Sequence, residues 1–189
     1  MPTAISSEQR YSTASIAMHW LMVLAFIGIY ASINLTEIFP QGEAGAAGRQ
    51  WAMDTHFSLG LLVFGLVWLR LLFRLMGSTP AIVPAPPAWQ EKLAQLAHLA
   101  LYAMMVLMPL AGLAAVNTHG HSVTFFGLAV PQLLAENEKW SHTIMRIHEL
   151  GGNVGYFLIG AHALAALFHH YFVKDNSLRR MLLKSLRVK

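Results

Sequence analysis

Four long apolar stretches constrain the fold of this chain more than any other feature of its sequence. They lie near 14–36, 52–76, 93–117 and 143–173, and each has the roughly 20 residues that a helix needs to span a membrane. Only 12% of the residues are charged, against about 25% in a soluble domain. We therefore expect an all-α fold, an integral membrane four-helix bundle that forms a single domain over 1–189.

Glycine and proline separate the stretches. A segment around Pro40 rich in glycine and alanine follows the first, and a proline-rich run over 80–87 follows the second. The third connection, near 118–142, is the longest and carries enough charge to stay at the surface. Residues 1–15 lack the pattern of a cleavable signal peptide, so we expect the first helix to remain as an uncleaved anchor.

The basic residues predict the orientation of the bundle, because Lys and Arg favour the cytoplasmic side of a membrane. Ten would lie on the side of the two termini and the second connection: Arg10, Arg70, Arg74, Lys92, Lys174, Arg179, Arg180, Lys184, Arg187 and Lys189. Three would lie on the other side: Arg49, Lys139 and Arg146. This bias predicts that both termini are cytoplasmic and that the basic tail contacts lipid headgroups, without a role in nucleic-acid binding.

Histidine is the main candidate for metal chemistry, because the chain has ten histidines and no cysteine. The lack of cysteine excludes disulfides, cysteine-ligated iron–sulfur clusters and covalent c-type haem. Five histidines fall within the apolar stretches and away from the ends of the chain: His19, His56, His98, His148 and His162. Any one of them could be a core residue, but ionisable groups at membrane depth are costly, and five together indicate a functional site.

The depths of these histidines suggest two pairs. His148 and His162 are fourteen residues apart, which places them within about 40° of one helix face and separates them by ~21 Å along the axis. His56 lies at the outer depth of His148, and His19 lies at the inner depth of His162. This is the layout of two stacked haems, each held by two histidines, with His98 as a rival inner ligand.

Other interpretations of the histidines remain open at this point. Imidazole also binds zinc, copper or nickel, although such sites usually recruit carboxylates or thiolates, and a histidine-lined proton path is another alternative. Small residues near the pairs would let a flat ring approach, and they are Gly60, Gly151, Gly152 and Gly155. Outside the stretches, we expect His119, His121 and His142 to be solvated loop residues, and Glu149 to be an interface residue.

Several motifs together resemble the prokaryotic cytochrome b561 family over nearly the whole chain. They are Ile16-Ala-Met-His19-Trp20, His56-x-x-x-Gly60, Thr79-Pro80, His98-x-x-x-Tyr102, Pro109-x-x-Gly112, His148 through Gly155-Tyr156, Gly160-x-His162, and His169-His170-Tyr-Phe-Val-Lys-Asp175. Within the family, the sequence is most similar to the superoxide:ubiquinone oxidoreductases. The resemblance implies two haems b, with His19 and His162 on the inner iron, His56 and His148 on the outer iron, and His98 near a haem without binding iron.

The resemblance also implies a function in the bacterial inner membrane. Superoxide would be oxidised at the outer side, where Arg146 lies two residues before His148 and suits an anionic donor. Ubiquinone would be reduced near His169, whose neutral imidazole could hydrogen-bond a carbonyl and supply a proton. The expected partners are thus membrane lipid, ubiquinone, and either superoxide or a redox partner protein.

Two other functions stay open on the sequence alone. Related diheme cytochromes share the haem ligands but serve as membrane-anchor subunits that link a dehydrogenase or hydrogenase to the quinone pool. A histidine-based transporter is the third alternative, and it would bind no haem.

Overall fold

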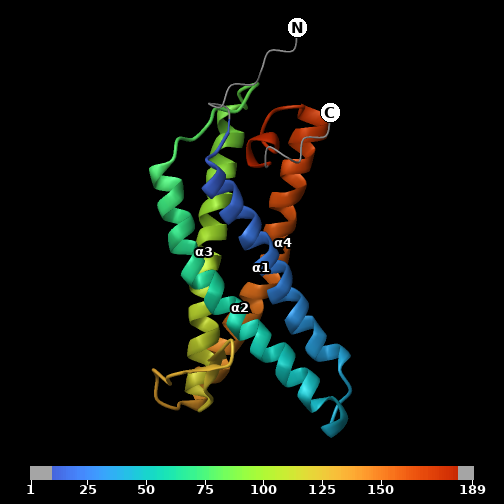
Figure 1. Ribbon diagram of the computed structural model, residues 1–189, viewed down its shortest axis with the longest axis vertical. Helices are drawn as coiled ribbons and strands as arrows, with labels where there is room; N and C mark the ends of the chain where they lie inside the picture. The colour runs from blue at the N-terminus through green and yellow to red at the C-terminus, as the bar shows by residue number, and fades with distance from the viewer. Residues whose placement is uncertain (1–9, 183–189) are drawn as a thin grey trace.

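The structure is a computed structural model that describes residues 10–182. Its four long helices are α1 (Thr13–Ile38), α2 (Glu43–Met76), α3 (Ala88–Thr118) and α4 (Glu138–Phe168). They form an elongated bundle in which the start of α1, the α2–α3 connection and the end of α4 lie at one end (Figure 1). All four are long and apolar enough to cross a membrane, which confirms the expected all-helical membrane bundle.

Three helices begin earlier than the apolar stretches predicted. Helix α2 starts at Glu43, so the segment rich in glycine and alanine that we expected to be a connection is helical. Helix α3 starts at Ala88, and α4 starts at Glu138 behind an N-cap at Asn137. Apolarity marks only the part of a helix inside the hydrocarbon region, and a run of alanine continues a helix beyond it.

Large apolar side chains cover the outside of the bundle, as a lipid-facing surface requires. Phe157, Phe172 and Leu75 are 80%, 75% and 75% exposed. The helices satisfy their backbone polar groups internally, which is a condition for crossing a bilayer. Lipid therefore takes the place of water around these helices.

The compact core lies among α1, α2 and α3, and α4 contributes little to it. Helix α1 packs along α2, and α3 packs along α4, while α1 and α4 have hardly any direct contact. The core cluster comprises Met22, Ala25, Val63, Val67 and Met105. By contrast, the only buried residues of α4 are Ser141 and Gly155. Helix α4 is thus held mainly by α3, and it faces α1 and α2 across a region with few direct helix contacts.

The outer connection contains a short hairpin that the sequence did not reveal. Strands β1 (Val123–Phe125) and β2 (Leu128–Val130) pair antiparallel. Phe126 and Gly127 join them with φ of 48° and 85°, the left-handed pair that a tight two-residue hairpin turn requires. The backbone N–H of Phe126 donates to Ser58 Oγ at 2.9 Å, which ties the hairpin to α2.

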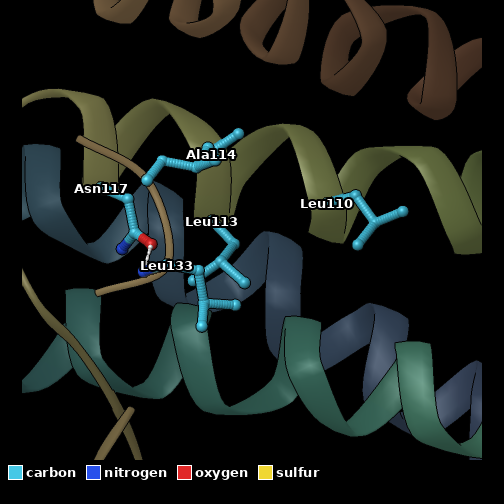
Figure 2. Close-up of a pocket in the computed structure, with 6 residues that line it drawn as sticks. Leu110, Leu113, Ala114, Asn117 and Leu133 are labelled. Atoms are coloured by element: carbon cyan, nitrogen blue, oxygen red, sulfur yellow. Dashed lines mark hydrogen bonds between the residues drawn. The ribbon is translucent and has the colours of Figure 1, made fainter. Parts of the chain in front are cut away.

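A buried asparagine anchors the rest of this connection to the end of α3. Asn117 is 1% exposed, and its Oδ1 accepts a hydrogen bond from the backbone N–H of Leu133 at 2.9 Å (Figure 2). Beside it lies an apolar depression of about 230 Å³. Its lining residues are Leu110, Leu113, Ala114, Asn117, Leu133 and Leu134 (Figure 2). None of the histidines lines this depression, so it is separate from the paired histidines.

At the opposite end, the chain after α4 folds back over the bundle. It continues as a π-helix η2 (His169–Val173) and a 3-10 helix η3 (Arg179–Met181). Trp20 Nε1 donates to the carbonyl of Met181 at 2.7 Å, and the backbone N–H of Val83 donates to Asn176 Oδ1 at 2.9 Å. These contacts form an inner cap over the ends of the helices. The tail residues Lys184, Arg187 and Lys189 counted for orientation lie outside the described residues.

Candidate functional site

The structure brings the two outer histidines together. His56 on α2 and His148 on α4 have ring centres 6.1 Å apart and ring planes 84° apart. The Nδ1 of His56 lies 3.1 Å from the carbonyl oxygen of Ile29, and the Nδ1 of His148 lies 3.0 Å from that of Met108. A carbonyl only accepts, so each Nδ1 carries a hydrogen that it donates. Each Nε2 is therefore left with a free lone pair, as in histidines that bind a metal.

The inner histidines also meet, and here there are three. His19 on α1 and His162 on α4 have ring centres 6.4 Å apart, while His98 on α3 lies 5.4 Å from His162. His162 thus has two neighbouring histidines, one on α1 and one on α3. Distance is then the criterion that separates them.

One metal ion between two opposed imidazoles sets a definite spacing. Two metal–nitrogen bonds of about 2 Å each, with each ring centre roughly 1 Å beyond its nitrogen, place the centres about 6 Å apart. The separations of 6.1 Å for His56–His148 and 6.4 Å for His19–His162 agree with this value. The separation of 5.4 Å for His98–His162 is shorter. The spacing therefore favours His19 over His98 as the inner partner.

The inner pair differs from the outer pair in what its Nδ1 atom meets. The Nη2 of Arg70 lies 3.1 Å from Nδ1 of His19. A guanidinium has only donors, so in this arrangement His19 accepts at Nδ1 and carries its hydrogen on Nε2. The same guanidinium lies 5.8 Å from the centre of the Tyr102 ring. Binding of a metal by Nε2 of His19 thus requires Arg70 to release Nδ1.

Glycine makes room for one of the outer rings. A Cβ at Gly112 of α3 would lie 2.9 Å from Cε1 of His148, closer than real Cβ contacts allow. Of the glycines singled out in the sequence, Gly60 and Gly152 face open space, while Gly151 and Gly155 face side chains of the bundle. The sequence did not single out Gly112 for this contact, since it lies on a different helix from His148.

A tyrosine connects α1 to α4 between the two histidine pairs. Tyr30 Oη donates to the carbonyl of Gly152 at 2.9 Å, and the Tyr30 and Tyr156 rings lie 4.1 Å apart. Asn34 Nδ2 donates to Tyr156 Oη at 2.6 Å. This cluster provides the direct link between helices that otherwise scarcely touch.

The expected quinone residue, His169, lies where α4 ends and η2 begins. Its Nδ1 is 2.6 Å from Oδ2 of Asp175, a contact that the sequence pattern did not predict. Because successive residues of an α-helix are about 100° apart, its neighbour His170 would point away from it and towards lipid headgroups. The structure instead places Nδ1 of His170 in a buried position without a hydrogen-bond partner among the described residues.

The remaining outer candidates are exposed. Arg146 and Glu149 project from α4, and no hydrogen bond or ion pair joins Arg146 to another described residue. The rings of His119 and His121 lie 5.1 Å apart and those of His119 and His142 lie 6.2 Å apart. Within residues 10–182, however, no group of three or more histidine, aspartate or glutamate residues is arranged to hold a metal ion.

The chain is similar to known membrane cytochromes along almost its full length. It is 41% identical to "Cytochrome b561 homolog 1" of Escherichia coli (strain K12), covering 92% of this chain and 97% of that protein. It is 38% identical to "Probable superoxide oxidase CybB" of Yersinia pestis, covering 94% and 98% of the two chains. It is 30% identical to "Cytochrome b561 homolog 2" of Escherichia coli (strain K12), covering 95% of each chain. Residues 10–184 match the family described as prokaryotic cytochrome b561, and the chain therefore belongs to this family.

Proposed function

We propose that this protein is a diheme b-type cytochrome that oxidises superoxide at the outer side of the bacterial inner membrane and reduces ubiquinone at the inner side. Membrane electron transfer follows from the family. The observation that carries the proposal is the pair of neighbouring imidazoles at each of two depths, with ring centres 6.1 Å and 6.4 Å apart.

Four histidines would hold the two haem irons. His56 and His148 would bind the outer iron, and their Nδ1–H···carbonyl bonds keep both Nε2 atoms available. His19 and His162 would bind the inner iron. When bound, haem supplies one-electron chemistry at a potential that its axial ligands and surroundings tune.

Arg70 has a part in the inner site. When Nε2 of His19 binds iron, its Nδ1 carries a hydrogen and repels the guanidinium donor that now faces it at 3.1 Å. Arg70 is then available to an anionic group such as a haem propionate. The contact between Arg70 and Tyr102 keeps the guanidinium at this end of the bundle.

At the outer end, superoxide is the donor that the comparisons support. A relative of this chain at 38% identity carries the name probable superoxide oxidase. Arg146 is exposed close to His148 and forms no ion pair with another described residue. Its charge would raise the local concentration of a small anion and so increase the rate of encounter.

At the inner end, His169 would receive the quinone head. It lies seven residues beyond His162, about two helical turns or ~10 Å along the axis. Its side chain is 22% exposed, and the exposed Phe168 and Phe172 beside it suit the apolar tail of a quinone in lipid.

The test is reduction of the purified protein by a superoxide generator without any partner protein. We expect the haem absorption bands to become reduced, and added ubiquinone to reoxidise them. Superoxide dismutase should abolish the reduction. If superoxide leaves the haems oxidised and a partner dehydrogenase or hydrogenase reduces them, the protein is an anchor subunit and the proposed donor is wrong.

A further inference from the structure

A buried carboxylate contacts the histidine at the inner end of α4. Oδ2 of Asp175 lies 2.6 Å from Nδ1 of His169. The Asp175 side chain is 1% exposed and that of His169 is 22% exposed. The carboxylate is thus enclosed, while the imidazole has access to a ligand on its other side.

The end of α4 changes its winding to form this contact. His169–Val173 form a π-helix, and Lys174 follows in the left-handed conformation with φ of 59°. The chain turns back there, so that the backbone N–H of Asp175 donates to the carbonyl of His169 at 3.2 Å. A continuous α-helix would carry residue 175 away from residue 169, since six residues advance about 9 Å along the axis.

Further groups hold the carboxylate in its ionised form. The backbone N–H of Ser177 donates to Asp175 Oδ1 at 2.8 Å. Burial alone would raise the pKa of the Asp175 carboxyl, but the hydrogen bonds from His169 and Ser177 outweigh it and hold this pKa below its ordinary value. Asp175 therefore stays ionised throughout the neutral range.

Other charged groups near the carboxylate come from η3, α2 and the segment before α1. Arg180 of η3 feels the charge of Asp175, and Arg74 of α2 and Tyr11 also act on Arg180. The guanidinium of Arg180 is directed to the carbonyl of Pro80 and to the Tyr11 ring. Arg180 forms no ion pair with Asp175 within 4 Å, so His169 is the partner that meets the carboxylate directly.

The contact determines which nitrogen of His169 can donate. An ionised carboxylate only accepts, so Nδ1 of His169 carries a hydrogen. A neutral ring then has a bare lone pair on Nε2, which cannot donate to a quinone carbonyl. Only the imidazolium form offers an Nε2–H. The sequence suggested donation from a neutral ring, but donation from Nε2 in this geometry needs a second hydrogen on the ring, because the carboxylate keeps the first on Nδ1.

We propose that Asp175 is a positioning residue for quinone reduction, which holds the Nδ1–H of His169 so that Nε2 faces a ubiquinone carbonyl and passes a proton to it. This inference rests on the proposed function. Overall, two superoxide ions, one ubiquinone and two protons give two oxygen molecules and one ubiquinol. As the quinone is reduced, the Nε2–H bond breaks and an O–H bond forms. The hydrogen on Nδ1 stays on His169 and hydrogen-bonded to Asp175. Water at the inner surface returns a proton to Nε2.

The test compares Asp175→Asn and Asp175→Glu in protein with both haems bound. We expect Asp175→Asn to lower quinone reduction about 10- to 100-fold near pH 7.5, because a positioned general acid contributes 10²- to 10⁴-fold and the amide removes only its stabilisation. Its pH profile should differ from that of the parent, because the carboxylate no longer accepts the Nδ1 hydrogen of His169. Asp175→Glu should recover most of the rate, and haem reduction by superoxide should be unchanged. Glu91→Gln is the matched control, because Glu91 is an exposed carboxylate in the first turn of α3.

The variants distinguish failure of this inference from failure of the proposed function. If His169→Ala loses quinone reduction but Asp175→Asn keeps the parent rate and pH profile, Asp175 has no such role and the quinone site stands. If His169→Ala keeps the parent rate, the quinone site itself is wrong. Nitrogen-15 NMR of histidine-labelled parent protein gives a check without a variant at Asp175. A hydrogen on Nδ1 of His169 is expected, and a neutral ring with its hydrogen on Nε2 would contradict the proposal.

Discussion

At the scale of single residues, hydrogen bonds at Nδ1 leave both outer histidines able to bind a metal through Nε2. His56 and His148 both donate at Nδ1 to main-chain carbonyls. The spacing along α4 predicted which histidines share a face, because an α-helix has a fixed period. The contacts of Gly112, Tyr30 and Asp175 could not be predicted in this way, since each joins segments whose relative position depends on packing.

The four proposed ligands can be tested by single alanine substitutions. His19→Ala, His56→Ala, His148→Ala and His162→Ala should each lower the haem content from two per chain to one, because each iron loses one of its two imidazoles. His98→Ala should retain two haems, since its ring lies 5.4 Å from His162, closer than a shared iron allows. A pyridine haemochrome assay gives the ratio, and loss of a haem in the His98 variant would transfer the inner ligand to His98.

The proposed role of His169 in quinone binding is tested by its own variant. His169→Ala should lower ubiquinone reduction by about 100-fold or more, because it removes a positioned proton donor. Reduction of the haems by superoxide should continue at the parent rate. His170→Ala is the neighbouring control and should reduce quinone normally. Quinone reduction at the parent rate in His169→Ala would place the site elsewhere.

At the scale of elements, apolarity predicted the four helices but not where they end or the short elements that follow or connect them. The helical segment before Trp51, the hairpin over 123–130 and the π-helix over 169–173 all lie at or beyond the ends of the four apolar stretches. Hydropathy carries no information there, and short elements depend on tertiary contacts such as that of Ser58 with the hairpin. In the proposed quinone site, the π-helix turns the chain so that Asp175 reaches His169.

A second prediction concerns Gly112, where α3 approaches α4 closely beside His148. Gly112→Ala should displace the His148 ring, because the added Cβ would lie 2.9 Å from its Cε1, and overpacking of this kind typically costs 1–3 kcal/mol. We expect partial loss of the outer haem, or an altered low-spin signal in electron paramagnetic resonance, with the inner haem unchanged. Gly65→Ala is the control, since nothing lies within 4 Å of a Cβ there. Identical spectra for both variants would show that Gly112 does not set the position of His148.

At the scale of the whole molecule, the bundle consists of two closely packed helix pairs that also meet in the core through α3. Helices α1 and α2 form one pair and α3 and α4 the other, and both proposed iron sites lie between them. The core among α1, α2 and α3 leaves α4 with few buried residues. Bound haem would therefore add contacts between the two pairs. Because a ligand that binds only the folded state stabilises that state, haem would also stabilise the fold.

The orientation of the bundle in the membrane is a prediction of the same scale. The excess of Lys and Arg at the end that carries both termini predicts that they face the cytoplasm. After fusion behind Lys189, a reporter enzyme that is active only in the cytoplasm should be active. A reporter enzyme that is active only outside the cytoplasm should be inactive. The opposite pattern would invert the bundle and exchange the sides assigned to superoxide and ubiquinone.

The central claim is that this chain holds two haems b, each between two histidines. A pyridine haemochrome assay on the purified protein, combined with electron paramagnetic resonance of the oxidised form, tests it most directly. Because two imidazoles leave no open position on either iron, we predict two haems b per chain, both low-spin. One haem or none per chain, or a high-spin iron in the intact protein, would contradict the account.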